Sequence, residues 1–182
     1  MARHKIRRGL RLPLAGEPST VIEDAPSARY VALLAADYLG LRPTMHVSVG
    51  DTVARGQLLF EDKTMPGVRY TTPAAGTVHA IHRGDRRALQ SVVVEQSRAE
   101  REGRNPEATT FRAYSGRHPS GMTGDEVRAL LLESGQWTAL RARPYGRVAD
   151  PAVRPHSIFV TAMDTNPLAP SVSAIVDGQA EP

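Results

Sequence analysis

Between residues 47 and 95, short runs rich in β-branched residues alternate with turn residues, a pattern that suits strands rather than helices. Glycine-containing turns separate the runs, which cover residues 47–49, 58–60, 68–72, 77–81 and 91–94. Strands of this length are typical of compact β-barrels and β-sandwiches. We therefore predict a β-rich domain over residues 1–98.

Two dipeptides mark the turns of this domain. Gly50-Asp51 suits a tight turn between strands, because Gly and Asp adopt positive φ at little cost. Pro66-Gly67 is a stronger turn signal. It predicts a hairpin with arms at residues 58–61 and 68–72 and a tip at residues 62–67.

Three further strands are expected beside this hairpin by the same reasoning. They cover residues 21–26, 29–34 and 45–49. In the second of them, the side chains of Tyr30, Val31, Leu33 and Leu34 leave little room for a polar face. These segments would complete the β-rich domain.

The second half of the chain changes character. Residues 99–122 are rich in Arg, Glu, Gly, Ser and Pro and are expected to link two domains. Thr123 and Glu126 then form a capping-box pattern, which predicts a helix over residues 123–134 ended by Gly135. The apolar run 157–162 precedes a turn rich in Asp and Asn, as the first strand of an α/β unit does. The fold class is therefore α+β, with residues 123–182 forming a helix and the start of a truncated α/β domain.

Composition excludes several kinds of chemistry. The chain has no cysteine, which removes disulfides, thiolate-bound iron–sulfur clusters and cysteine nucleophiles. A net charge of +4 would permit a nucleic-acid partner, but the basic residues are scattered and aromatic residues make up only 5%. No nucleic-acid partner is therefore expected. No apolar run approaches the ~20 residues that cross a bilayer, so we expect a cytoplasmic chain whose membrane association is peripheral.

Lys63 is the first candidate for chemistry, because biotinyl and lipoyl carrier domains attach their cofactor to a lysine at a hairpin tip. Its spacing argues against that role. Lys63 lies six residues after Gln57 but ten before Pro73, and Pro66-Gly67 takes the turn. A solvated turn lysine is the preferred interpretation, and a carrier or adaptor domain modified at Lys63 is the alternative.

The histidines do not form a recognisable metal site. His79 and His82 are three residues apart on a predicted strand, which places them on opposite faces unless a bulge intervenes. Glycine-rich phosphate loops and nucleophile elbows are also absent from the sequence. We therefore expect no metal ligands among the histidines.

The segment after the helix contains the only tryptophan of the chain. Trp137 can stack on a planar ligand while Arg141 and Arg143 bind its anionic part. Alternatively, Trp137 and Leu140 pack the helix on the barrel and the arginines stay solvated. Residue types alone favour the packing role.

Several motifs resemble known proteins. Residues 50–59 and 73–78 are similar to the barrel-sandwich hybrid of biotinyl and lipoyl carrier domains. The chain as a whole resembles the N-terminal part of the A subunits of the sodium-translocating NADH:quinone reductase, a bacterial respiratory complex. Its most specific stretches are SGQWTALRARP at 134–144 and AMDTNPLA at 162–169. The other collinear stretches are residues 6–9, 12–16, 31–34, 42–43, 50–51, 56–63, 66–68, 73–76, 82–84 and 89–92.

This resemblance implies a peripheral subunit on the cytoplasmic face of the bacterial inner membrane. The subunit would be bound to the membrane subunits of a complex that passes electrons from NADH to ubiquinone and exports Na⁺. Related flavoprotein subunits bind flavin with a glycine-rich loop, whose glycines are lost at residues 135–144. Neither flavin nor iron–sulfur clusters are therefore expected, and the chain alone should be inactive. The residues expected to face quinone or a partner protein are Trp137, Arg141, Arg143, Asp164 and Asn166.

Overall fold

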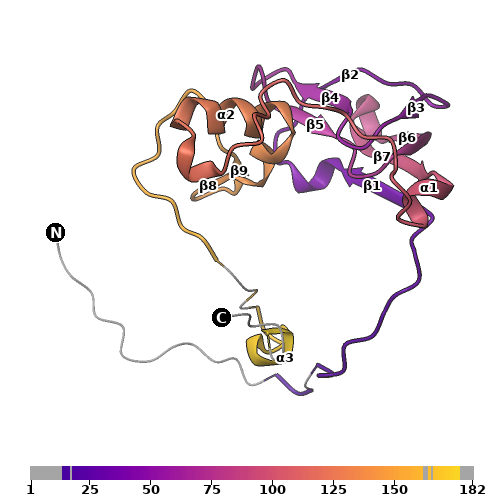
Figure 1. Ribbon diagram of the computed structural model, residues 1–182, viewed down its shortest axis with the longest axis vertical. Helices are drawn as coiled ribbons and strands as arrows, with labels where there is room; N and C mark the ends of the chain where they lie inside the picture. Colours follow the sequence, from indigo (N-terminus) through magenta and orange to yellow (C-terminus); the bar gives the residue numbers. More distant parts are fainter. Residues whose placement is uncertain (1–13, 17, 162–163, 165, 177–182) are drawn as a thin grey trace. The chain divides into compact units, whose positions relative to one another are not determined.

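The computed structural model describes residues 14–16, 18–161, 164 and 166–176 (Figure 1). The chain divides into two compact units. One is Ser27–Arg154, which contains all the β-sheets described below, and the other combines Met1–Pro26 with Pro155–Pro182. Among the described residues of this second unit there is one helix, α3 (Val172–Val176).

The unit Ser27–Arg154 is built on two antiparallel sheets, as the glycine-punctuated strand pattern predicts. The four-stranded sheet has the order β1-β7-β6-β3, with β1 at Tyr30–Leu34, β7 at Leu89–Gln96, β6 at Gly76–Arg83 and β3 at Thr52–Val53. The three-stranded sheet has the order β2-β4-β5, with β2 at Pro43–Met45, β4 at Leu58–Asp62 and β5 at Arg69–Thr71. The 3₁₀ turns are η1 (Ala35–Asp37), η2 (Asp85–Arg87), η3 (Pro119–Gly121) and η4 (Gln136–Ala139).

A register shift in β4 lets two consecutive side chains enter the core. The pairing with β5 skips a residue between Leu58 and Phe60, and both Leu59 and Phe60 are 0% exposed. The ring of Phe60 stacks on Tyr70, its cross-strand partner, at a centroid distance of 4.7 Å. Full burial of a side chain as large as Phe60 contributes roughly 1.5–3 kcal/mol. Burial of the Tyr70 side chain in this core also raises the pKa of its phenol, and the nearby negative charge of Asp62 is a smaller cause.

The hairpin predicted from Pro66-Gly67 is confirmed by the pairing of β4 with β5. Its tip is shaped by Asp62, whose carboxylate accepts hydrogen bonds from the backbone N–H of Arg42 at 3.2 Å and of Thr64 at 2.9 Å. A third bond comes from the Thr64 hydroxyl at 2.8 Å. These contacts explain why an acidic residue that is only 5% exposed is tolerated at the end of the strand.

Three predicted strands are not formed as expected. The strand over residues 45–49 ends at Met45, because the Asp51 carboxylate accepts a bond from the Ser48 N–H at 2.8 Å and draws the chain into a turn. Residues 21–26 and 157–161 also carry no strand. The side chains of these segments are exposed, as Ile22 at 71% and Phe159 at 85% show. Their backbones have no neighbouring strand to pair with among the described residues, and an unpaired strand is not stable in water. Residue 162 lies outside the described residues.

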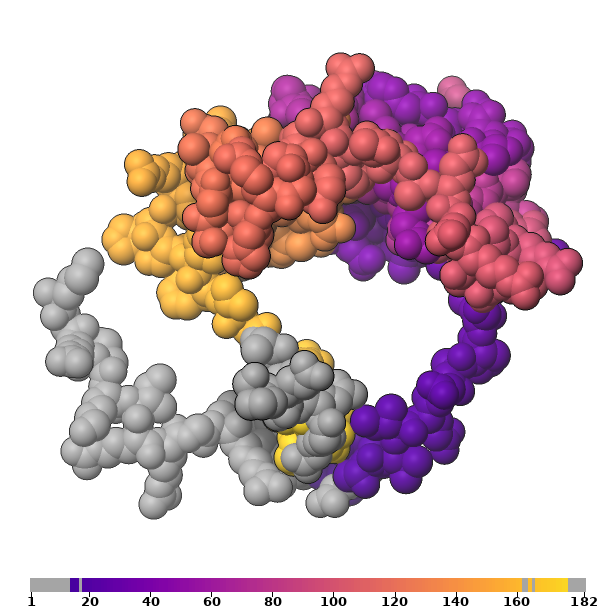
Figure 2. Space-filling model, in the orientation of Figure 1, coloured from indigo at the N-terminus to yellow at the C-terminus, as the bar shows by residue number. Residues whose placement is uncertain are grey.

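Residues 97–113, of which all but the first two belong to the expected linker, pack against the β-rich core and are named here the strap (Figure 2). The strap begins with the short helix α1 (Arg98–Arg101), capped by the Ser97 side chain. Further along, a parallel bridge joins Arg55 to Ala108. The ring of Phe111 then lies so close to Gly56 that a Cβ at this glycine would meet it at 2.8 Å.

Glu100 anchors the strap. Its side chain is only 8% exposed and lies 2.6 Å from the Arg55 guanidinium. It also accepts a hydrogen bond from the Ala75 N–H at 2.9 Å. Burial alone would raise the pKa of Glu100, but the bonds from Arg55 and Ala75 outweigh it and hold that pKa below its ordinary value.

The helix predicted after the strap is confirmed as α2 (Gly124–Glu133). Its capping box is present, since the Glu126 N–H donates to the Thr123 hydroxyl at 3.3 Å and the Thr123 N–H donates to the Glu126 carboxylate at 2.7 Å. The helix ends at Glu133 with Ser134 as its C-cap, and Gly135, which has a φ of 80°, then leads into η4. A Cβ at this glycine would meet the Thr71 hydroxyl at 2.5 Å, so the helix end approaches β5 closely.

The pKa of Glu100 is lower in the folded protein than in the unfolded chain. The ionised carboxylate therefore stabilises the fold at any pH above its unfolded pKa of about 4.3. This stabilisation is lost as the pH falls through the pKa of the folded state. We expect Glu100→Gln to lower the free energy of unfolding by about 1–3 kcal/mol at neutral pH. We also expect its stability to fall less than that of the parent below about pH 5. Urea unfolding followed by circular dichroism across this pH range measures both effects.

Glu102→Gln is the matched control, because the partners of Glu102 within the described part of the chain are the exposed Arg98 and Arg104. Its effect should stay within about 0.5 kcal/mol. Equal losses in the two variants would show that Glu100 does not anchor the strap.

Candidate functional site

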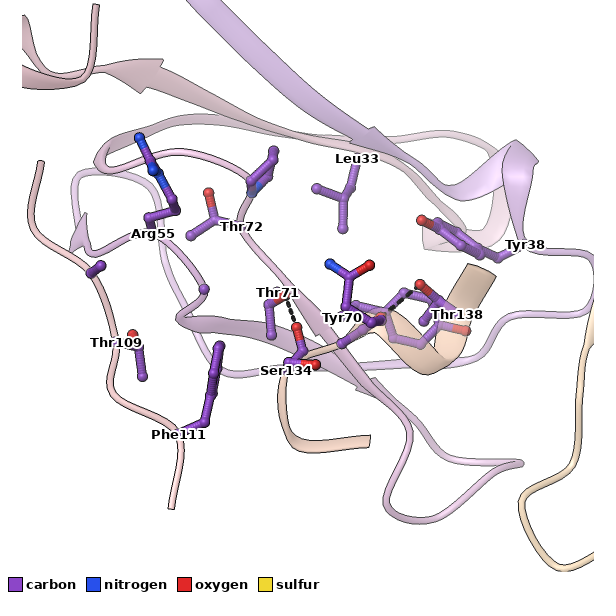
Figure 3. Close-up of a pocket in the computed structure, with 15 residues that line it drawn as sticks. Leu33, Tyr38, Arg55, Tyr70, Thr71, Thr72, Thr109, Phe111, Ser134 and Thr138 are labelled. Atoms are coloured by element: carbon purple, nitrogen blue, oxygen red, sulfur yellow. Dashed lines mark hydrogen bonds between the residues drawn. The ribbon is translucent and has the colours of Figure 1, made fainter. Parts of the chain in front are cut away.

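A groove of about 560 Å³ runs along the unit Ser27–Arg154 between the β-rich core, the strap and the end of α2 (Figure 3). Figure 3 shows Arg55, Thr109 and Phe111 at one end of the groove and Tyr38 with Thr138 at the other. Its lining comes from five separate parts of the chain. The lining residues are Leu33, Tyr38, Arg55, Gly56, Tyr70, Thr71, Thr72, Pro73, Ala108, Thr109, Phe111, Ser134, Gly135, Gln136 and Thr138.

Aromatic and aliphatic side chains form the apolar part of this groove. Tyr38 meets Tyr70 edge to face, with ring centroids 4.7 Å apart and an interplanar angle of 84°. Leu33 from β1 and Phe111 from the strap complete the apolar surface. Such a wall suits a planar ligand, because aromatic rings offer both stacking and edge contacts.

Apart from Arg55, whose guanidinium is paired with Glu100, the polar side chains of the groove carry hydroxyls and one amide. The Thr71 hydroxyl donates to the Ser134 carbonyl at 2.9 Å, which ties β5 to the end of α2. The Thr138 hydroxyl donates to the Gly135 carbonyl at 2.8 Å. Both oxygens keep lone pairs as acceptors, and the Gln136 amide adds donors from an exposed position.

Trp137 lies between two groove residues but points into the core. Its side chain is 8% exposed, and the indole N–H donates to the Ala149 carbonyl at 2.7 Å. The guanidinium of Arg128 lies 5.8 Å from the centre of the indole ring. Trp137 therefore fixes η4, and with it the positions of Gln136 and Thr138 on the groove.

Arg141 touches the groove through Tyr38. Its guanidinium lies 5.0 Å from the centre of the Tyr38 ring and donates to the Asp37 carbonyl at 2.9 Å. Arg143 lies two residues later in an exposed turn. Of the residues expected to face quinone or a partner, Trp137, Arg141 and Arg143 thus belong to one continuous segment.

Asp164 and Asn166 belong to the other unit. The Asp164 carboxylate accepts a hydrogen bond from the Asn166 N–H at 2.9 Å, and both residues are exposed. The structure therefore brings these two together in a local turn, as their spacing suggests.

Lys63 and the histidines that the structure describes lie at the surface. Lys63 is exposed directly after β4, and its backbone N–H donates to the Arg42 carbonyl at 2.9 Å. A bulge in β6 between Val78 and Ala80 interrupts the strict alternation assumed for His79 and His82, and both side chains are exposed. His79 instead lies against the Tyr30 ring, with centroids 4.9 Å apart.

Metal clusters and membrane-spanning helices are both absent from the described part of the chain. No group of three or more His, Asp or Glu side chains among these residues is arranged to hold a metal ion. Within the same residues, no helix is long and apolar enough to cross a membrane.

Sequence reasoning did not find the groove. Leu33 and Tyr38 lie far in the chain from Arg55 and from Phe111, and each of the four alone is typical of a core or surface residue. The one local signal was Gly56, whose missing side chain makes room for Phe111.

Comparison with known proteins identifies relatives for nearly the whole chain. A family model described as the NqrA N-terminal barrel-sandwich hybrid domain matches residues 4–97, and one described as the NqrA second alpha/beta domain matches residues 122–182. These matches confirm both the resemblance stated from the motifs and the predicted fold class.

The similar proteins are named as the A subunits of Na(+)-translocating NADH-quinone reductases. The chain is 48% identical over 177 residues to the protein from Cellvibrio japonicus, covering 97% of the chain and 38% of that protein. It is 51% identical over 172 residues to the protein from Saccharophagus degradans, covering 94% of the chain and 37% of that protein. It is also 48% identical over 176 residues to the protein from Vibrio parahaemolyticus, covering 97% of the chain and 38% of that protein. The chain thus spans less than two fifths of the length of these relatives.

Trp137→Phe should lower the free energy of unfolding by about 1–3 kcal/mol, because it removes the donor to the Ala149 carbonyl and leaves space beside the core. Urea unfolding monitored by circular dichroism measures this loss. Tyr114→Phe, at a side chain that is 64% exposed, serves as control and should change stability by no more than about 0.5 kcal/mol. An equally small effect of Trp137→Phe would contradict the anchoring role.

Proposed function

Because the chain belongs to the NqrA family, we propose that it is the N-terminal part of the NqrA component of a Na⁺-translocating NADH–quinone reductase. In this proposal the chain is a non-redox, peripheral piece on the cytoplasmic face of the bacterial inner membrane. It shapes a quinone-binding surface and helps to assemble the complex with its membrane subunits. Motif collinearity and the identity to the named relatives support the proposal.

The observation that carries the quinone role is the groove beside η4. Its volume of about 560 Å³ falls in the range of about 300–1,000 Å³ typical of small-molecule sites. A quinone head is planar and uncharged, so Tyr38 and Phe111 suit its ring. Its two carbonyl oxygens need hydrogen-bond donors, which the Tyr38 hydroxyl, the Thr109 hydroxyl and the Gln136 amide can supply. The isoprenoid tail of ubiquinone would leave through the open side.

The arginine and tryptophan act on this groove indirectly. Arg141 holds Tyr38 by stacking on its ring and by bonding to the adjacent backbone at Asp37. Trp137 holds η4 from the core side. Arg143, with Asp164 and Asn166, faces outward and is proposed to meet the surroundings of the complex rather than the quinone ring.

Electron transfer itself belongs to other parts of the complex in this proposal. A thiolate-bound iron–sulfur cluster needs cysteine, and the chain has none. After Gly135, residues 136–144 contain no glycine, whereas the related flavoprotein subunits approach a flavin phosphate with a glycine-rich loop. The chain alone is therefore expected to bind quinone without reducing it.

The alternative function, a carrier or adaptor domain modified at Lys63, rests on the exposure of Lys63 at the end of β4. Intact mass spectrometry of the protein purified from its host separates the two functions. We expect the mass of the unmodified chain. A lipoyl or biotinyl adduct mapped to Lys63 would favour the carrier.

Trp137 is the only tryptophan and lies between two groove residues, so its fluorescence should report occupancy. Titration with a short-chain ubiquinone analogue should quench this fluorescence saturably. Tyr38→Ala should weaken binding about tenfold, since an aromatic contact and its buried surface together contribute about 1.4 kcal/mol. Gln136→Ala, at an exposed position, should weaken it several-fold without a change in melting temperature.

Tyr114→Ala removes an exposed tyrosine that does not line the groove and should leave the affinity unchanged. Affinities of Tyr38→Ala and Gln136→Ala equal to that of this control would exclude the groove as the quinone site.

A further inference from the structure

The short hairpin formed by β8 (Arg141–Ala142) and β9 (Arg147–Val148) presents an unusual combination of side chains. Figure 1 shows it beside α2. Every residue from 141 to 147 is exposed, and Tyr145 at the tip is 76% exposed. Arg143 and Arg147 flank this tyrosine on either side. An aromatic side chain with this exposure, two residues from an arginine on each side in the sequence, has no evident part in the packing of its own domain.

The base of the hairpin is firmly held. Val148 is 5% exposed, and the Ala149 N–H donates to the Leu140 carbonyl at 2.9 Å. The Ala149 carbonyl in turn accepts the indole N–H of Trp137. A bond from the Gly146 N–H to the Ala142 carbonyl at 2.9 Å closes the tip. The exposed side chains are thus carried on an ordered backbone, which lowers the entropic cost of binding through them.

The charge of the hairpin is not balanced locally. Residues 141–154 contain four arginines and one acidic residue, Asp150, whose carboxylate accepts a bond from the Ala152 N–H at 2.9 Å. In the part of the chain that the structure describes, neither Arg143 nor Arg147 forms a salt bridge, whereas Arg29, Arg55 and Arg98 do. The tip therefore offers two unpaired guanidinium groups to an external anion.

We propose that this tip, residues 143–147, contacts the headgroup region of an anionic phospholipid bilayer. Guanidinium groups bind phosphate oxygens in a bidentate manner. Tyrosine is enriched at the membrane–water interface because its ring is apolar while its hydroxyl remains hydrated. A hairpin only two residue pairs long also offers no groove to seat a peptide, which favours a flat anionic surface over an acidic protein segment.

This inference rests on the proposed function for its setting, because it names what Arg143 would face in a peripheral subunit. It adds a direct lipid contact to the contacts with membrane subunits. The same tip then orients the unit Ser27–Arg154 on the membrane surface.

Co-sedimentation with vesicles tests the proposal on the full chain. We expect binding to vesicles of phosphatidylcholine with phosphatidylglycerol, little binding to phosphatidylcholine alone, and weakening by salt. The double variant Arg143→Gln/Arg147→Gln should bind the anionic vesicles about 25-fold more weakly, at about fivefold for each arginine. Tyr145→Ser should weaken binding several-fold at every salt concentration, because it removes an apolar contact.

The matched control is Arg86→Gln/Arg87→Gln, which removes the same charge from the exposed turn η2. It should weaken binding by no more than about twofold, because two distant exposed charges are largely screened. Unchanged circular dichroism and melting temperature would show that both double variants are folded.

Several outcomes would overturn the proposal. Absence of binding by the parent chain to anionic vesicles is one, and equal losses in the two double variants is another. Binding to soluble polyglutamate but not to vesicles would assign the tip to an acidic protein partner instead. Quinone titration of the parent chain separates this inference from the proposed function: vesicle binding without quinone binding rejects only the groove, and the reverse result rejects only the lipid contact.

Discussion

The ion pair between the buried carboxylate of Glu100 and the half-exposed guanidinium of Arg55 is the contact on which the arrangement of the strap depends. A carboxylate with 8% exposure is costly unless each of its oxygens is paired. Here one oxygen meets the Arg55 guanidinium and the other accepts the Ala75 N–H. This pairing fixes the start of the strap on the β-rich core. The backbone bonds between Arg55 and residues 107 and 109 then extend the attachment.

The groove follows from that attachment. One of its walls is the strap itself, through Thr109 and Phe111, and without the strap the other wall would be an open sheet surface. The second wall depends on a different close approach, in which Gly135 lets the end of α2 come against Thr71 on β5. Two anchored segments thus turn a carrier-like barrel into a surface with a pocket.

The segment after α2 serves two surfaces at once. Trp137 is bound from the core side, which fixes η4 along the groove, and the same Ala149 carbonyl that accepts its N–H lies at the base of the β8–β9 hairpin. A single hydrogen bond, from Trp137 to Ala149, therefore connects the proposed quinone surface with the proposed membrane contact. Stabilising one would stabilise the other, since both rest on the same few backbone positions.

Local patterns were sufficient where the deciding interaction is itself local. The capping box of α2, the Pro66-Gly67 hairpin and the fold class could be predicted because turns, caps and strand alternation involve residues close in sequence. The motifs were also long enough to reveal the family. Patterns failed where a partner decides, as at residues 157–161, whose apolar run has no ladder to join among the described residues.

The amino-acid sequence by itself determined the β-rich and helical elements, the family and the absence of cysteine chemistry. Only the tertiary structure decided that Trp137 points inward, that a bulge interrupts β6 beside His79, and that Leu33, Tyr38, Arg55 and Phe111 meet along one groove. The physical reason is that periodicity specifies which face of an element is apolar. Which distant segments close over that face depends on a few non-local contacts, such as Glu100 with Arg55, that no local pattern encodes.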